Sequence, residues 1–76
     1  MKLYKVVFET EVVILAEDEN EAITNASYYV KEEAPELMDL ELVESMEQIP
    51  NWRGSLPYSA HKSYNGFEKR CEDFVS

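Results

Sequence analysis

The stretch VVILAEDENEAITNASYYV, residues 12–30, decides the fold of this chain. Its first part, Val12–Ala16, is a run of β-branched and aliphatic residues that favours a buried strand. The polarity changes at Glu17, and Asp18 is placed to act as the N-cap of a helix, with Glu21 three positions later as in a capping box. The stretch therefore predicts a strand that leads directly into an amphipathic helix.

The apolar periodicity after Asp18 predicts a helix over about residues 19–33. Its acidic first turn is favourable at the positive end of the helix dipole. Pro35 ends the helix, because proline lacks an amide donor and disfavours helical geometry in the residue before it. The expected buried face consists of Ala22, Ile23, Ala26, Tyr29 and Val30.

A strand is also expected ahead of Val12–Ala16, because Lys2–Phe8 alternates in polarity. The turn between the two strands falls at Glu9–Glu11, which contains no glycine or asparagine, so the sequence specifies its register weakly. A three-residue loop would turn alternate residues of both strands toward the helix. Those residues are Tyr4, Val6, Phe8, Val12, Ile14 and Ala16.

A third strand is predicted over Leu37–Met46, in which Leu40, Leu42 and Met46 share one parity. Short right-handed connections place this strand parallel to the second, with the first strand between them. The expected fold class is α+β, a three-stranded antiparallel sheet of order 2-1-3 with one helix on one face. Residues 1–47 would form this ββαβ core of a single domain that includes the whole chain of 76 residues.

Residues 48–76 are expected to cover the rest of the core as a loop and a short C-terminal helix. Pro50, Gly54 and Pro57 interrupt regular structure, whereas the aromatic residues between them anchor the loop. The helix is predicted from an apolar stripe at positions i, i+4 and i+7, formed by Phe67, Cys71 and Phe74.

The face of the sheet turned away from the helix is apolar as well. Because a soluble protein rarely exposes so much apolar surface, two alternatives follow. Either the segment from Trp52 to Phe74 covers this face, or a second copy or another protein does. The second strand, Val12–Ala16, also offers an apolar edge to which a further strand could pair. The residues of this second face are Leu3, Val7, Val13, Leu15 and Val43.

The net charge of the chain is −9, and it is distributed unevenly. Residues 1–50 carry thirteen acids and three lysines, whereas residues 51–76 carry three acids and four basic residues. Direct binding to nucleic acid or to anionic lipid is not expected, because phosphate would be repelled. The expected partner is a protein with a basic surface. The alternative is that the acids only keep a small domain soluble.

The side chains predict neither an enzyme nor a cofactor-binding protein. His61 is the single histidine, and Cys71 fits its apolar stripe better than a reactive thiolate pair. No spacing typical of a calcium, zinc or phosphate site is present in the sequence. A lone cysteine without a signal peptide predicts a reducing cytoplasm, and the longest apolar run, Val12–Ala16, is too short to span a membrane.

Two groups of side chains are the candidate partner-binding residues. Trp52, Arg53, Tyr58 and Tyr64 are residue types that dominate binding hot spots, although Trp52 is also suited to closing the core. Tyr28 is added as an expected exposed residue of the helix. If the partner normally binds nucleic acid, exposed carboxylates could imitate the phosphates of a duplex. The acidic candidates are Glu17, Glu19, Glu32, Glu33, Glu36 and Glu44.

The chain also resembles many small acidic bacteriophage and mobile-element proteins with a strand–strand–helix–strand layout. The resemblance lies in Tyr4-x-Val6, Val12-x-Ile14-x-Ala16-x-Asp18-x-x-Glu21-Ala22, Ile49-Pro50, Trp52 and Leu56-Pro57-Tyr58. Some such proteins inhibit host defence systems, which implies a phage-encoded inhibitor in the cytoplasm of a bacterial host. The leading expectation is thus a non-enzymatic acidic module that docks on a basic host protein. The alternative is a homodimeric structural or assembly protein.

Overall fold

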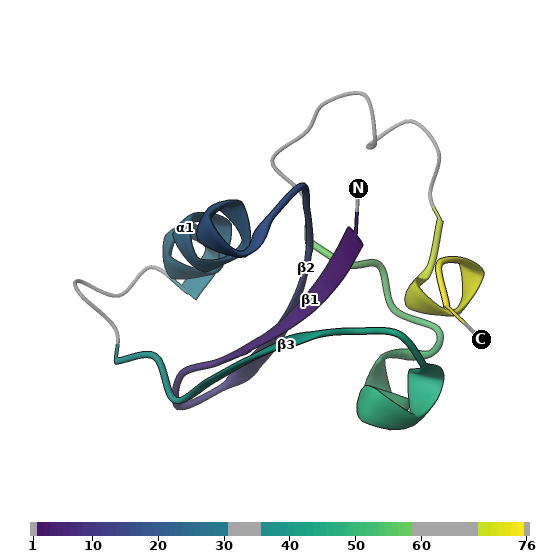
Figure 1. Ribbon diagram of the computed structural model, residues 1–76. Coiled ribbons are helices and arrows are strands. Elements are labelled where there is room, and N and C mark those ends of the chain that lie inside the picture. The colour runs from purple at the N-terminus through teal and green to yellow at the C-terminus, as the bar shows by residue number, and fades with distance from the viewer. Residues whose placement is uncertain (1, 31–35, 59–68, 76) are drawn as a thin grey trace.

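The computed structural model of the chain describes residues 2–30, 36–58 and 69–75. The sheet consists of β1 (Lys2–Val7), β2 (Glu11–Ala16) and β3 (Asp39–Leu42), and the helix is α1 (Glu19–Val30) (Figure 1). β1 lies between β2 and β3 and runs antiparallel to both. The predicted α+β class and the strand order 2-1-3 are confirmed.

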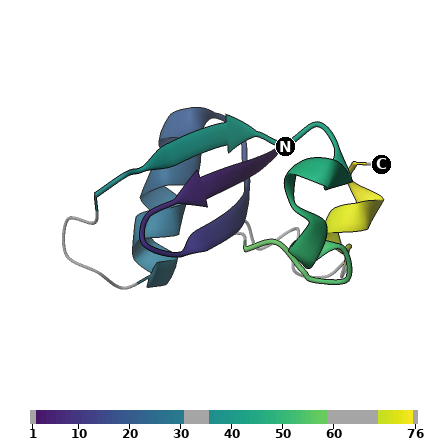
Figure 2. The same cartoon turned by 90° about the horizontal axis from the view of Figure 1, so that it is seen from below.

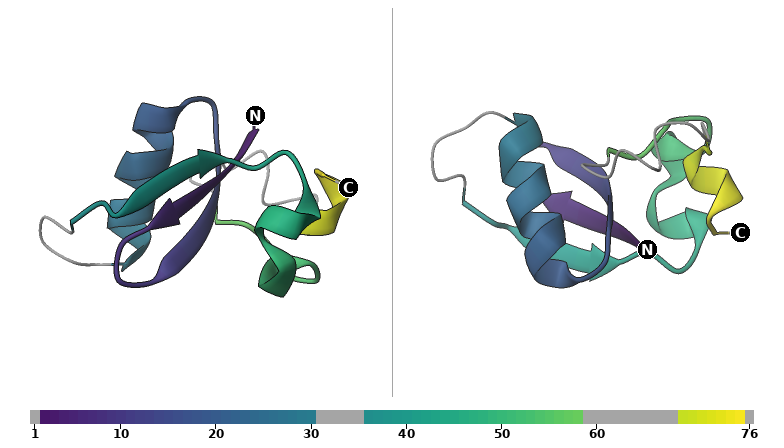
Figure 3. Two further views of the ribbon diagram at one scale, coloured as in Figure 1. Left: turned by 60° about the horizontal axis from the view of Figure 1, so that its bottom comes forward. Right: turned by 90° about the horizontal axis from the view of Figure 1, so that it is seen from above.

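In the part of the chain that the structure describes, three 3-10 turns follow the sheet: η1 (Met46–Gln48), η2 (Pro50–Trp52) and η3 (Cys71–Asp73). In Figure 1 the helix and these turns lie on opposite sides of the three strands. Figures 2 and 3 show that the turns gather toward the end of the sheet at which β1 begins. The molecule therefore has a helix layer, a sheet layer and a layer of turns. Among the described residues, no helix has the length and apolarity that crossing a membrane requires.

The strand register turns one apolar face toward α1. The loop between β1 and β2 has three residues as expected, but it consists of residues 8–10 and not of Glu9–Glu11. Val6 is consequently opposite Val12 and Tyr4 is opposite Ile14, a shift of two residues that keeps the same side chains on the helix face. Ala22 and Ala26 are fully buried on the helix side of this contact, because small residues allow the helix to lie close to the sheet. The predicted face is confirmed, with a core of Tyr4, Val6, Phe8, Val12, Ile14, Ala16, Ala22 and Ala26.

The start of α1 is fixed by Asp18, as the sequence predicts. The Oδ1 atom of Asp18 accepts a hydrogen bond from the amide of Glu21 at 2.8 Å, and the Asp18 carbonyl accepts the first helical bond from Ala22 at 3.0 Å. The carboxylate thus satisfies an amide that has no partner within the helix.

We expect Asp18→Ala to lower the free energy of unfolding by about 1 kcal/mol, since the amide of Glu21 loses its acceptor. Urea denaturation followed by circular dichroism measures this change. Asn20→Ala, at an exposed position of the same turn, is the control and should change stability by less than about 0.5 kcal/mol. Equal losses for both variants would contradict the capping role.

The second face of the sheet is covered by the chain itself. Leu3, Val13 and Leu15 from the strands are buried against Ile49 and Cys71, which come from the later segment. The same cluster includes Val43 and Met46, and it is flanked by Trp52, Phe74 and Val75. The covering segment, one of the two alternatives for this face, therefore packs on the predicted residues Leu3, Val13, Leu15 and Val43, whereas Val7 is not part of the cluster.

The third strand is shorter than predicted, and this changes the place of Met46. β3 ends at Leu42, and the chain then enters η1, for which the Ser45 side chain is the N-cap. Met46 consequently packs with Val43 in the cluster on the second face of the sheet, rather than sharing the helix face with Leu40. We refer to the cluster of Leu3, Val13, Leu15, Val43, Met46, Ile49 and Cys71 as the second-face cluster. The expected parity fails for Met46 because a strand alternation holds only while the backbone stays extended.

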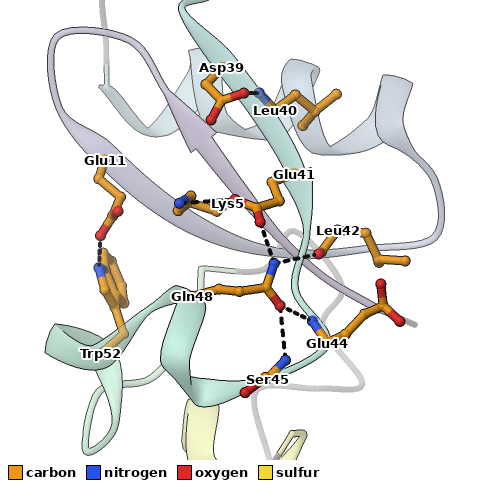
Figure 4. A network of polar contacts seen from close by, with 10 residues as sticks. All are labelled: Lys5, Glu11, Asp39, Leu40, Glu41, Leu42, Glu44, Ser45, Gln48 and Trp52. Atoms are coloured by element: carbon orange, nitrogen blue, oxygen red, sulfur yellow. Dashed lines mark hydrogen bonds and ion pairs between the residues drawn. The ribbon is translucent and has the colours of Figure 1, made fainter.

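At each edge of the sheet, some of the outward backbone groups are occupied by hydrogen bonds from within the chain. At β2, the amide of Leu15 donates to the Tyr58 carbonyl at 2.8 Å and the Tyr58 amide donates to the Val13 carbonyl at 3.0 Å. At β3, the amide of Leu40 donates to the Asp39 carboxylate and the Leu42 carbonyl accepts from the Gln48 side chain (Figure 4). These contacts occupy backbone groups through which another strand would pair.

The predicted C-terminal helix is one 3-10 turn within the described residues. Cys71 is fully buried in the second-face cluster and Phe74 packs against that cluster, so both apolar positions are used as expected. Phe67, the remaining member of the predicted stripe, lies outside the described residues, as does the predicted helix segment 31–33.

Candidate functional site

Three aromatic side chains meet at the β2 edge of the sheet. The Tyr29 and Tyr58 rings are stacked, with centroids 4.7 Å apart and an angle of 19° between their planes. The Trp52 ring meets Tyr58 edge to face, at 6.0 Å and 79°. We refer to Tyr29, Trp52 and Tyr58 as the aromatic cluster. It brings together residues from the helix, a 3-10 turn and the loop that follows, so it exists only in the folded chain.

Local backbone contacts hold the aromatic cluster in place. Tyr58 is fixed by its two hydrogen bonds to β2, and Trp52 follows Pro50 in η2, where its indole N–H donates to Glu11 Oε2 at 3.1 Å (Figure 4). Glu11 itself is the first residue of β2. The indole is therefore tied to the sheet by a hydrogen bond to a charged acceptor, a strong class of hydrogen bond.

A hollow of about 380 Å³ lies beside the aromatic cluster. Its floor and walls combine aromatic rings, aliphatic side chains and one carboxylate, that of Glu11. Glu11 is the only acidic or basic side chain among the described residues that line it. The complete lining within the described chain is Phe8, Thr10, Glu11, Val12, Tyr29, Val30, Trp52 and Tyr58.

The predicted hot-spot residues have different surroundings. Trp52 is half-buried and Tyr58 is 44 % exposed, and the structure brings these two together at the hollow. Arg53 is exposed and forms a 3.8 Å ion pair with Glu72, so it does not line the hollow. Tyr28 is 80 % exposed, which confirms its expected exposure, and its ring meets that of Tyr29 edge to face.

The predicted acidic residues within the described ranges are all on the surface. Glu17, Glu19, Glu36 and Glu44 are exposed, and none of them forms an ion pair with another described residue. Glu32, Glu33 and Tyr64 lie outside the described residues. The exposed acids of the described chain are Glu9, Glu17, Asp18, Glu19, Glu36, Asp39, Glu44, Glu47, Glu72 and Asp73.

Glu41 differs from these acids because its charge is neutralised locally. Lys5 Nζ lies 3.0 Å from Glu41 Oε2, and the Gln48 side chain donates to Oε1 (Figure 4). The hydrogen bond from Lys5, followed by that from Gln48, holds the pKa of Glu41 below its usual range, and the same bond raises the pKa of Lys5. The stabilising contribution of Glu41 is present at neutral pH and is lost as the pH falls through its lowered pKa.

Cys71 is not placed as a nucleophile. Its side chain is fully buried, and burial raises the pKa of the thiol to about 11. A thiol with so high a pKa is almost entirely protonated at neutral pH, whereas reactive cysteines have a lowered pKa and access to solvent. His61, the other half of the hypothetical pair, lies outside the described residues.

We therefore expect the Cys71 thiol to react with a disulfide reagent such as Ellman's reagent only when the protein unfolds. Native protein at pH 8 should react at least about 100-fold more slowly than protein in concentrated urea, because the thiol is buried and protonated. The absorbance of the released thiolate measures the rate. Equal rates in buffer and urea would contradict the burial of Cys71.

Sequence reasoning missed several residues of this site. Phe8, Val12, Tyr29 and Val30 were expected as core residues, and Glu11 as part of a turn, but all five line the hollow. Glu11 and Trp52 are 41 residues apart in the sequence and meet only in the folded chain. No sequence signal could have found this pair, because it depends on how the covering segment returns to β2.

The described residues include no group of three or more metal-binding side chains placed to hold an ion. A comparison of the chain with protein-family models, curated protein sequences and solved structures returned no match.

Proposed function

We propose that this protein is a non-enzymatic binding module that docks on the basic surface of another protein. The observation that carries the proposal is the exposure of four carboxylates that have no ion-pair partner among the described residues. They belong to Glu17, Glu19, Glu36 and Glu44. Unneutralised surface charge of one sign attracts an oppositely charged surface and accelerates association.

The exposed aromatic residues support a docking role. Tyr28 is 80 % exposed and Tyr58 is 44 % exposed, and tyrosine contributes large contact area at low cost in conformational entropy. The resemblance to small acidic bacteriophage proteins extends the proposal to a phage-encoded inhibitor of a host defence protein. In that case the carboxylates would take the place of nucleic-acid phosphates on a basic surface.

Fewer surfaces are available for a homodimer than the sequence suggests. The second sheet face is covered by the chain's own residues, and both sheet edges carry hydrogen bonds to Tyr58, Asp39 and Gln48. A dimer that paired through either edge would first have to break these hydrogen bonds. Light scattering at high protein concentration tests it, and a monomeric mass would exclude a homodimeric function.

The docking proposal is tested by capture of partners from a bacterial lysate at about 50 mM and about 500 mM salt, read by mass spectrometry. A partner held by surface charge should be lost at high salt, because screening weakens exposed charge interactions. The triple variant Glu17→Lys, Glu36→Lys, Glu44→Lys reduces the net charge from −9 to −3 and should release the same partner.

The matched control is Thr24→Gln, at an exposed helix position, which leaves the charge unchanged and should retain the partner. The corresponding Glu→Gln triple variant removes three negative charges without reversing them. It should capture less of the partner than the wild type does and more than the Glu→Lys triple variant does. A partner bound equally at both salt concentrations, and equally by all variants, would overturn the docking proposal.

A further inference from the structure

We propose that the hollow beside the aromatic cluster binds an arginine side chain of the partner protein. This inference rests on the proposed docking function and names the contact that would give it specificity. It follows from three features of the described residues: ring faces, one carboxylate, and the absence of a lysine or arginine among the described residues of the lining.

The ring geometry suits a planar cation. Trp52 and Tyr58 stand at 79° to each other with centroids 6.0 Å apart, so their rings form two walls at nearly a right angle. Tyr29, which also lines the hollow, stacks on Tyr58 at 4.7 Å and fixes the orientation of that ring. Cations bind over the faces of tryptophan and tyrosine, and a guanidinium group also stacks on them because it is flat.

The carboxylate of Glu11 supplies the charge. Its Oε2 atom accepts the Trp52 indole N–H at 3.1 Å, which fixes the carboxylate at the wall of the hollow. A carboxylate has two oxygens and about four lone pairs, so Glu11 retains capacity to accept from a guanidinium. An anionic ligand is disfavoured for the same reason, since it would meet Glu11 without a compensating cation among the described lining residues.

Four of the five described cations have contacts elsewhere, and the fifth, Lys2, is not among the residues that line the hollow. Lys5 pairs with Glu41, Arg53 pairs with Glu72, Lys69 lies 5.7 Å from the Phe74 ring centroid, and Arg70 donates to the Gly54 carbonyl. The volume of about 380 Å³ exceeds that of one guanidinium group, so the adjoining methylene groups can rest on the aliphatic residues Val12 and Val30. A partner of basic surface charge would supply the arginine.

The experiment uses Trp52 as the reporter, because it is the single tryptophan of the chain and lines the hollow. Full-length protein is titrated with the peptide acetyl-Gly-Ser-Arg-Ser-Gly-amide, with the same peptide containing citrulline, and with the same peptide containing lysine. Citrulline keeps the planar shape of arginine but has no charge. We expect a saturable fluorescence change, with arginine bound about 10-fold more tightly than citrulline and more tightly than lysine.

Two variants separate the contributions of the site. Glu11→Gln keeps an acceptor for the indole N–H and removes the charge, so it should weaken arginine binding about 5- to 10-fold and leave citrulline binding unchanged. Tyr58→Leu removes a ring wall but leaves the backbone bonds to β2, and should weaken arginine binding similarly. Tyr28→Leu, an exposed tyrosine outside the hollow, is the control and should bind as the wild type does.

Equal affinities for arginine and citrulline, or no saturable change with any peptide, would overturn the arginine proposal. A lysine peptide bound as tightly as the arginine peptide would also overturn it, since the site would then not distinguish a guanidinium. The outcome is separable from that of the docking test. If partner capture depends on salt but no peptide binds selectively, the arginine proposal is wrong and the docking proposal stands. If the arginine peptide binds selectively but partner capture does not depend on salt, the docking proposal is wrong.

Discussion

Replacing Ile49 by alanine is expected to lower the free energy of unfolding by about 2–5 kcal/mol. Ile49 is fully buried at the centre of the second-face cluster, where it packs with Leu3, Val13 and Leu15. The substitution removes apolar contacts and leaves a cavity between the sheet and the covering segment. A single core in a domain of this size supplies only about 3–5 kcal/mol, so much of the variant should be unfolded at 37 °C.

Urea denaturation followed by Trp52 fluorescence measures this loss. Leu56→Ala is the matched control, because Leu56 is an aliphatic residue of the same segment but is 45 % exposed. It should change the free energy of unfolding by less than about 1 kcal/mol. If the two variants were equally stable, the covering segment would not be packed on the sheet as described.

Replacing Gln48 by alanine is expected to cost about 2 kcal/mol of stability. The Gln48 side chain accepts from the amides of Glu44 and Ser45, at 2.6 and 2.9 Å, and donates to the Glu41 carboxylate and the Leu42 carbonyl (Figure 4). One half-buried side chain thus closes the end of β3 and starts η1. Water can replace part of these bonds, so the loss is smaller than four separate bonds would suggest.

The variant Gln48→Glu tests whether the stability depends on the acceptor oxygen of the Gln48 amide or on its donor nitrogen. It keeps an acceptor for the two amides but loses the donor and places a second carboxylate beside Glu41. It should therefore be destabilised at pH 7 and recover in part near pH 4, as the carboxylates become protonated. Glu47→Ala, at an exposed neighbour, is the control. A Gln48→Ala variant as stable as this control would contradict the role of Gln48.

The sequence was sufficient to predict most of the layer formed by the sheet and the helix. The alternation in Lys2–Phe8, the aliphatic run of β2 and the Asp18 cap are local patterns, and local patterns determine element type and buried face. The end of β3 was not predictable, because it depends on the Gln48 side chain reaching back to residues 42, 44 and 45. Nothing in the spacing of those residues distinguishes such a contact from a continued strand.

The candidate site was only half predictable. Residue type identified Trp52 and Tyr58, since large aromatic residues in a loop must either bury their rings or contact a partner. Their neighbours Glu11 and Tyr29 were assigned to a turn and to the core, because their place at the hollow follows from tertiary packing over long sequence separations. The acidic candidates were predicted as surface residues simply because unpaired charges are costly to bury.

The hydrogen bonds at the sheet edges have a consequence for concentrated solutions of this protein. Amyloid growth requires an open strand whose amides and carbonyls can template the next molecule. Here Tyr58 occupies one rim of the sheet and the side chains of Asp39 and Gln48 occupy groups on the other. Elongation of the aliphatic run of β2 into a cross-β stack would therefore require the two hydrogen bonds to Tyr58 to break first.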